Sequence, residues 1–135
     1  MLNQLNNSTK VLEKALDATW LRNEAITQNI ANVDTPNYKR KTVKFEEYLS
    51  DALDKDRKNS AAVQTNQNVA GSEVDKINPV ITTDNSSLST RLDGNNVDIE
   101  SEMASLAKNA LQYNTLIQSM SKKFSMLKYV IREGR

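Results

Sequence analysis

The sequence predicts a mainly α protein in which long N- and C-terminal helices form an α-helical hairpin or coiled coil. Between them it predicts a loop-rich central insert that contains at most short strands. Apolar residues recur in heptads at both ends of the 135-residue chain, whereas the middle is rich in small polar residues. Three Gly, two Pro and 5% aromatic residues leave too few turns and too thin a core for a sandwich or barrel. We therefore divide the chain into an N-terminal helix (1–33), an insert (34–97) and a C-terminal helix (98–135).

The N-terminal segment predicts a helix from about residue 9 to 33, capped by Ser8 or Thr9. Its apolar spacing starts at Leu2 and Leu5 and ends at Val33. Within it we expect four seam residues to pack in the assembled protein: Leu12, Leu16, Ile26 and Ile30. Thr19 and Asn23 fall on the same seam and are polar. Polar seam residues weaken a coiled coil but fix its register, so this helix is expected to set register.

A turn is predicted directly after this helix. Pro36 biases the preceding residue away from helical geometry, and Asn37 tolerates a left-handed conformation. Residues 38–44 are short, basic and expected to be extended, and residues 45–56 are expected to form a short helix. Residues 57–97 read as a loop-rich stretch in which Val80–Thr83 is the one strand-like run.

The C-terminal segment, residues 98–132, carries the strongest pattern. Asp98 is a good N-cap, and acidic residues in the first turn and basic residues in the last complement the helix dipole. Ten seam positions over five heptads are all apolar: Ile99, Met103, Leu106, Ala110, Tyr113, Ile117, Met120, Phe124, Leu127 and Ile131. We expect one apolar stripe to face the N-terminal helix and a second contact face to meet other chains.

The residue inventory argues against catalysis and against a cofactor. The chain has neither Cys nor His, which removes thiol nucleophiles, the usual proton shuttle and the common zinc ligands. Asp93–Asp98 does not follow the calcium-loop pattern and reads as a turn before a capped helix. Asp51, Asp54 and Asp56 read as a solvated face. We therefore predict that the protein is not an enzyme and has no small-molecule substrate.

The charge pattern argues against binding to nucleic acid or to an anionic membrane. The formal net charge is +1, so there is no strong field to attract nucleic acid. The basic run of Lys39, Arg40, Lys41 and Lys44 is interpreted as a solvated loop in preference to a nucleic-acid patch. The first residues lack the basic and apolar regions of a cleaved signal peptide, and no apolar stretch is long enough to span a bilayer.

The turn region carries a resemblance to a known family. The residues in question are Ala31, Asn32, Thr35, Pro36 and Tyr38, at the end of an N-terminal helix. This pattern resembles the signature of the bacterial flagellar rod and hook proteins, which pair it with a C-terminal heptad helix. The family usually has Gly where this chain has Asn37, a residue that also tolerates a positive φ angle. The region 93–103 and the tail 121–128 are similar to the proximal rod members.

The resemblance implies a structural subunit of the basal-body rod, located in the periplasm and exported without a cleaved signal. Its implied partners are copies of itself, other rod proteins, the membrane-embedded ring protein, the junction protein at the rod base and the flagellar type III export apparatus. Terminal helices would build an inner tube that transmits torque. The alternative is a cytoplasmic coiled-coil adaptor or export chaperone, which explains the helices but not the turn motif.

Overall fold

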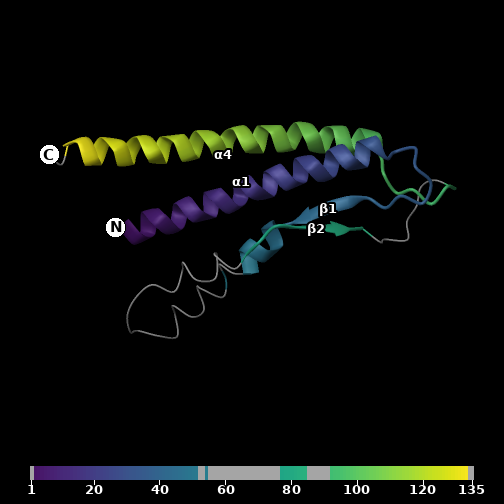
Figure 1. The fold of residues 1–135 in the computed structure, drawn as a ribbon, viewed down its shortest axis with the longest axis horizontal. Coiled ribbons are helices and arrows are strands. Elements are labelled where there is room, and N and C mark those ends of the chain that lie inside the picture. The colour runs from purple at the N-terminus through teal and green to yellow at the C-terminus, as the bar shows by residue number, and fades with distance from the viewer. Residues whose placement is uncertain (1, 52–53, 55–76, 85–91, 134–135) are drawn as a thin grey trace.

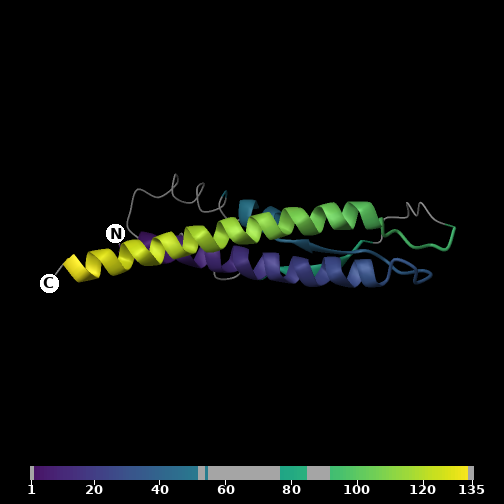
Figure 2. The same ribbon diagram turned by 90° about the horizontal axis from the view of Figure 1, so that it is seen from above.

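The molecule is built around two long antiparallel helices. The computed structural model describes residues 2–51, 54, 77–84 and 92–133. Helix α1 (Leu2–Ala31) and helix α4 (Ile99–Glu133) run side by side over most of their length (Figures 1 and 2). The predicted mainly α fold, a helical hairpin with short strands between its two helices, is confirmed.

The helix bounds differ from the sequence prediction at the N-terminus. Helix α1 begins at Leu2, so Ser8 and Thr9 lie inside it and do not cap its start. The apolar spacing that includes Leu2 and Leu5 continues to the start of the chain and outweighs the weak helix propensity of the Asn and Ser residues. At the other end α1 stops at Ala31, and residues 32–37 form turns.

A two-stranded antiparallel ribbon packs beside α1. Strand β1 (Lys41–Lys44) pairs with strand β2 (Val80–Thr83), with Lys41 opposite Thr83 and Lys44 opposite Val80. The strand-like run at 80–83 is therefore confirmed as a strand. The predicted short helix at 45–56 is seen at residues 46–51, and most of its second half lies outside the described residues.

The apolar core lies between α1 and the ribbon and does not lie between the two long helices. Small alanine side chains on α1 let β1 and the segment that follows it come close. The core consists of Ala18, Ala25, Val43, Phe45 and Ile77, with Ala15, Leu21, Leu49 and Ile81 packed against it. Helix α1 is thus the middle layer, between α4 and the ribbon (Figure 1).

Helix α4 is longer than its partner. Its last turns extend past the start of α1 in both views, so no helix among the described residues lies beside this end of α4 (Figures 1 and 2). Within the described residues, neither helix is long and apolar enough to cross a membrane.

Phe45 is the largest side chain in this core, and it is only 3% exposed. Replacing it with Ala should lower the free energy of unfolding by about 3 kcal/mol, because it leaves a cavity between α1 and the ribbon. Urea denaturation followed by circular dichroism measures the change. Tyr48→Ala, at an exposed neighbouring position, should cost less than about 1 kcal/mol. Equal losses in the two variants would contradict this placement of the core.

Candidate assembly surface

The two motifs from opposite ends of the chain meet in space. Asn95, which is fully buried, donates its side-chain amide to the backbone carbonyls of Asn32, Val33 and Thr35 at 2.9–3.0 Å. The side-chain oxygen of Asn95, Oδ1, accepts the backbone N–H of Val97 at 2.8 Å. These carbonyls belong to the turn that follows α1, so Asn95 ties this turn to a distant part of the chain.

Two residues with positive φ angles let the turn after α1 and the loop before α4 approach each other closely. Asn37 has φ 59° and Gly94 has φ 77°, and the N–H of Asn37 donates to the carbonyl of Asp93 at 2.9 Å. The prediction that Asn37 adopts a left-handed turn is confirmed. A Cβ atom on Gly94 would lie 2.7 Å from Oδ1 of Asn37, so the Asn37 side chain would have to move, and the positive φ angle of Gly94 would strain any side chain there.

The same loop leads into α4. The side chain of Asp98 accepts the N–H of Glu100 at 3.1 Å, and α4 begins at Ile99, as expected of an N-cap. The region 93–98 therefore acts as a turn before a capped helix. Among the described residues there is no cluster of carboxylates that could hold a metal ion.

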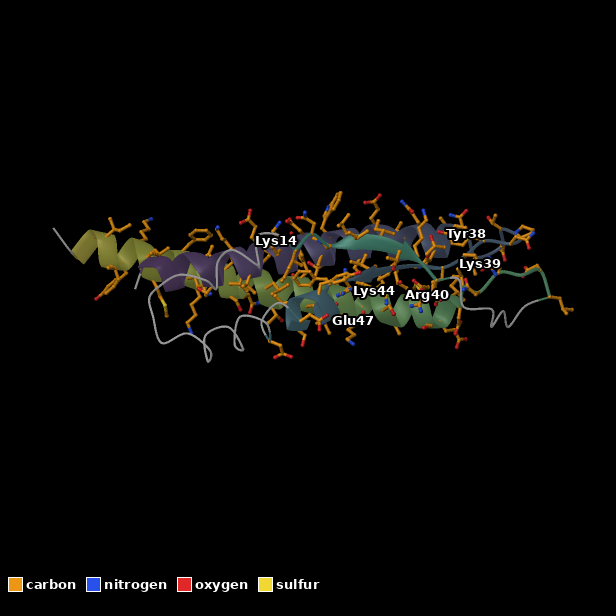
Figure 3. All side chains as sticks on the ribbon, turned by 90° about the horizontal axis from the view of Figure 1, so that it is seen from below. Lys14, Tyr38, Lys39, Arg40, Lys44 and Glu47 are labelled. Atoms are coloured by element: carbon orange, nitrogen blue, oxygen red, sulfur yellow. The ribbon has the colours of Figure 1, made fainter. Side chains whose placement is uncertain are left out.

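The basic run after the turn is structural, which corrects its interpretation as a solvated loop. Lys39 Nζ donates to the carbonyl of Gly94 at 2.8 Å, and Lys41 Nζ donates to Gln28 at 2.7 Å. The backbone N–H of Arg40 donates to Asn96 at 2.7 Å. Figure 3 shows Tyr38, Lys39 and Arg40 gathered at the end of the molecule where α1 stops. These cations tie the turn to the body of the protein.

A buried carboxylate joins the two long helices at this end. Glu102 of α4 is 1% exposed; it accepts Arg40 Nε at 2.5 Å and the Asn29 amide at 3.1 Å. Asn29 of α1 also pairs with both backbone groups of Lys41, at 2.8 Å each. Every polar atom of the Asn29 side chain is thereby used, as a buried amide requires. One residue holds α1, β1 and α4 together.

Tyr38, the last residue of the family turn motif, belongs to this network. Its hydroxyl donates to Oδ1 of Asn29 at 3.3 Å. Burial and, next, the negative charge of Glu102 raise the pKa of Tyr38 above its ordinary value. Because ionisation is disfavoured, the phenol stays a hydrogen-bond donor in the folded chain.

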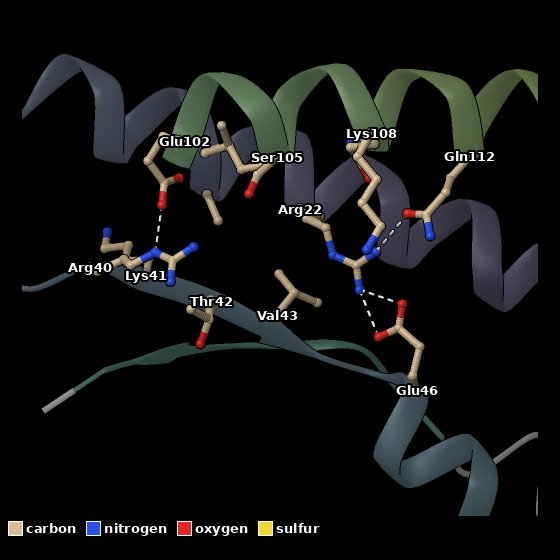
Figure 4. A pocket seen from close by; sticks show the side chains of 13 residues that line it. Arg22, Arg40, Lys41, Thr42, Val43, Glu46, Glu102, Ser105, Lys108 and Gln112 are labelled. Carbon is tan, nitrogen blue, oxygen red and sulfur yellow. Dashed lines mark hydrogen bonds and ion pairs between the residues drawn. The ribbon is translucent and has the colours of Figure 1, made fainter. Parts of the chain in front are cut away.

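A second bridge lies further along the hairpin. Arg22 of α1 makes two 2.7 Å bonds to the carboxylate of Glu46 and a 3.4 Å bond to Gln112 of α4 (Figure 4). Burial alone would raise the pKa of Glu46. The hydrogen bonds and charge of Arg22 outweigh burial, so the pKa of Glu46 is lowered. Glu102 and Glu46 thus each pair with an arginine at opposite ends of one polar pocket.

The face that α4 turns toward α1 is therefore largely polar. Three of its side chains bond α1 directly: Glu102 to Asn29, Asn109 to the backbone carbonyl of Thr19 at 2.9 Å, and Gln112 to Arg22. The buried or half-buried positions on this face follow a heptad spacing: Glu102, Ser105, Asn109, Gln112, Leu116, Ser119 and Lys123.

The apolar stripe predicted for α4 occupies the positions that directly follow those of the polar face in the sequence. Each residue of the polar face directly precedes a stripe residue, which rotates the stripe by about 100° away from α1. Seven of its ten positions are exposed: Ile99, Met103, Ala110, Tyr113, Ile117, Phe124 and Ile131. Leu106, Met120 and Leu127 are half-buried. The expectation that this stripe faces the N-terminal helix is wrong, because polar contacts set the rotation of α4.

On α1 the predicted seam residues do lie on buried or half-buried positions. Ile26 is buried, and Leu12, Leu16 and Ile30 are half-buried. Of the two polar seam residues, Thr19 is buried at the α4 contact, whereas Asn23 is exposed. A groove begins at Leu16 and continues onto the stripe through Ile117, Met120 and Phe124.

In the turn motif, Asn32 and Tyr38 are half-buried, whereas the remaining members are exposed: Ala31, Thr35, Pro36 and Asn37. Sequence reasoning did not identify the side chains that hold the motif in place. Asn29 and Asn95 look like ordinary polar residues in the chain, and only their fixed offsets from the two motifs could have drawn attention to them.

Comparisons with known proteins identify the family of this chain. The family model described as "Flagella basal body rod protein" matches residues 10–39, which include most of α1 and the turn motif. A relative from Bacillus subtilis is 37% identical over 92% of this chain and 92% of its own length. The chain therefore belongs to the flagellar basal body rod proteins.

The particular member that it resembles is FlgB. The Bacillus subtilis relative is named flagellar basal body rod protein FlgB. So are a Borreliella burgdorferi protein, 30% identical over 97% of this chain and 100% of its own, and an Escherichia coli protein, 26% identical over 99% of both chains. The similarity spans both long helices and the segment between them.

The amide of Asn95 gives the first test of this site. Asn95→Ala should lower the free energy of unfolding by about 1–3 kcal/mol, because the turn after α1 loses a buried amide that donates to three of its carbonyls. Thermal denaturation measures the change. Asn114→Ala, on an exposed position of α4, serves as the matched control and should be nearly neutral. If Asn95→Ala were equally neutral, the contact between the two motifs would not stabilise the fold.

The Arg22–Glu46 pair gives a pH-dependent test. Because the folded-state pKa of Glu46 is lowered, the pair stabilises the protein above the ordinary glutamate pKa, and this stability is lost as pH falls through the lowered value. In Arg22→Met the pKa of Glu46, measured by NMR titration of its carboxyl carbon, should rise. Lys44→Met, which removes the exposed cation beside Glu47, should leave the pKa of Glu46 unchanged. An unchanged value in Arg22→Met would contradict the bridge.

Proposed function

We propose that this chain is a structural subunit of the proximal rod of the bacterial flagellar basal body, and that it assembles through the exposed apolar stripe of α4. The stripe is the observation that supports the proposal. It leaves large side chains such as Ile117, Phe124 and Ile131 more than 40% exposed in the single chain. A contiguous exposed apolar surface is typical of a protein contact site.

The hairpin explains how such a subunit could carry load. Its own two helices are held by buried hydrogen bonds, so its shape does not depend on the stripe. Burying each large stripe residue against a neighbour would contribute roughly 1.5–3 kcal/mol. Summed over the length of α4, these contacts would hold neighbours firmly. Contacts between unlike faces that do not close on themselves build a helical array, the geometry of a shaft that transmits torque.

The finer assignments are part of the same proposal. The subunit would lie in the periplasm, reach it through the flagellar type III export apparatus without a cleaved signal, and contact the membrane-embedded ring protein and the junction protein beneath the rod. Family membership and the names of the relatives support a place among rod components. The role proposed for the protein is mechanical and not enzymatic, in line with those names.

Charged substitutions on the stripe test the proposal. Ile117→Asp and Phe124→Asp place a carboxylate where a neighbour would bury an apolar side chain, while both positions stay exposed in the single chain. We expect unfolding free energies within about 1 kcal/mol of wild type but loss of the chain from purified basal bodies and loss of motility. Gln118→Asp, on an exposed position beside the stripe, is the control and should assemble. Normal basal bodies in both stripe variants would overturn the proposal.

A further inference from the structure

The register of the β1–β2 ribbon shows which of its backbone groups point outward. In an antiparallel pair, residues that bond across the ladder alternate with residues whose N–H and C=O groups point away from it. The N–H of Asp84 donates to the carbonyl of Arg40 at 2.7 Å, so in this register Thr82 also bonds across the ladder. Outward backbone groups therefore belong to four residues, two on each strand: Lys41, Val43, Ile81 and Thr83.

The outer edge of β1 is closed at Lys41, whereas the outer edge of β2 is open. The Asn29 side chain bonds both outward groups of Lys41, as a neighbouring strand would. On β2, no described residue bonds the outward groups of Ile81 or Thr83. Figure 1 shows β2 as the strand farther from α4. Backbone N–H and C=O groups are obligatory hydrogen-bonding groups, so this edge is complementary to an extended chain.

Strand β2 lacks the features that usually keep an exposed edge from pairing. Charged side chains, an internal proline or a bulge are typical of such edges. The strand reads Val-Ile-Thr-Thr, so every residue is β-branched and none is charged, and its pairing with β1 is uninterrupted. Val80 is 52% exposed. This strand can therefore pair on both of its edges.

Strand β2 follows one row of side chains on α1. Lys14 Nζ donates to Oδ1 of Asn78, just before the strand, at 2.9 Å. Two turns further along the helix, Leu21 packs against the same apolar core as Ile81. Strand β1 lies on the α4 side of this row, because the residue that precedes it bonds Glu102. The open edge of β2 therefore adjoins the flank of α1 that is turned away from α4.

That flank of α1 is acidic. Asp17 and Glu24 lie at i−4 and i+3 from Leu21 and are exposed. Neither forms an ion pair with a described residue, and Glu24 accepts only the neutral amide of Gln28. Trp20 lies beside them, 64% exposed, and the face of an indole ring also attracts cations. Every second side chain of a strand added to β2 would point toward this flank, so the flank favours a strand with Lys or Arg at alternate positions.

We propose that the open edge of β2 binds an extended, basic segment of another basal-body component as a third strand. Backbone bonds to Ile81 and Thr83 hold the segment, and Asp17 and Glu24 select its cationic side chains. This surface is separate from the α4 stripe, so it gives the subunit a second kind of contact. The inference rests on the proposed function, because the segment belongs to the same assembly.

Amide hydrogen exchange tests the strand pairing directly. In the single chain, the N–H groups of Ile81 and Thr83 should exchange quickly, whereas that of Thr82 is held by the ladder. In purified basal bodies we expect Ile81 and Thr83 to exchange roughly tenfold more slowly or slower still. Mass spectrometry with electron-transfer fragmentation resolves the individual amides. Fast exchange of both amides in basal bodies that contain the chain would overturn this inference and leave the rod assignment intact. Absence of the wild-type chain from basal bodies would overturn both.

A proline substitution provides a second measurement. Thr83→Pro removes an outward N–H and no bond of the ribbon, so the single chain should keep the circular dichroism of the wild type. In cells that express both chains, we expect the share of Thr83→Pro in basal bodies to fall about fivefold. Thr83→Val keeps the N–H and is the matched control, which should assemble normally. A wild-type share of Thr83→Pro would overturn the pairing. If this variant unfolds, the exchange of the wild-type amides decides.

Neutralising the acidic flank tests the choice of a basic partner. Asp17→Asn with Glu24→Gln should lower the share of the chain in basal bodies about two- to fivefold, because the carboxylates that select the cations are lost. Glu47→Gln with Asp51→Asn changes the same charge at exposed positions elsewhere and should have no effect. Equal shares for the two double variants would show that the segment is not selected by its charge and would overturn that part of the inference.

Discussion

The rest of the structure depends on the polar contact between α1 and α4. Glu102 is buried, and a buried carboxylate is stable only where donors meet it. Asn29 and Arg40 supply those donors in the observed rotation of α4. A rotation by one residue, about 100°, would turn the apolar stripe toward α1 and strip Glu102 of its partners. The hairpin therefore keeps its apolar stripe on the outside because its polar residues occupy the inside.

In this arrangement three different sets of residues fix the ribbon, align the two long helices and remain available for contacts with neighbours. The apolar core fixes the ribbon to α1, the buried amides and carboxylate fix the register of the long helices, and the stripe is left for neighbours. Buried polar groups add little net stability compared with apolar packing, but they discriminate sharply between registers. A subunit whose helices were joined by the stripe itself would have little apolar surface left for assembly.

Much of the fold could be predicted from the sequence because its elements are long and periodic. The two helices, the turn at Pro36, the cap at Asp98 and the strand at 80–83 all follow from local patterns. The orientation of α4 could not be predicted, because heptad spacing identifies an apolar stripe without saying what covers it. The bonds of Asn29 and Asn95 span 73 and 60–63 residues, and no local pattern in a single sequence encodes such distances.

The hairpin is closed at one end and open at the other. At the closed end, Asn95 and the Glu102 network join both helices to the turn and the ribbon; at the open end, α4 extends past the start of α1. Local stability should therefore decline along the molecule, from the turn toward the two chain termini. An arriving subunit could part its helices at the open end, admit the helices of its neighbours and close again, while the turn kept the register. Incorporation would then require only local opening, and the growing assembly would not have to wait for a whole chain to refold.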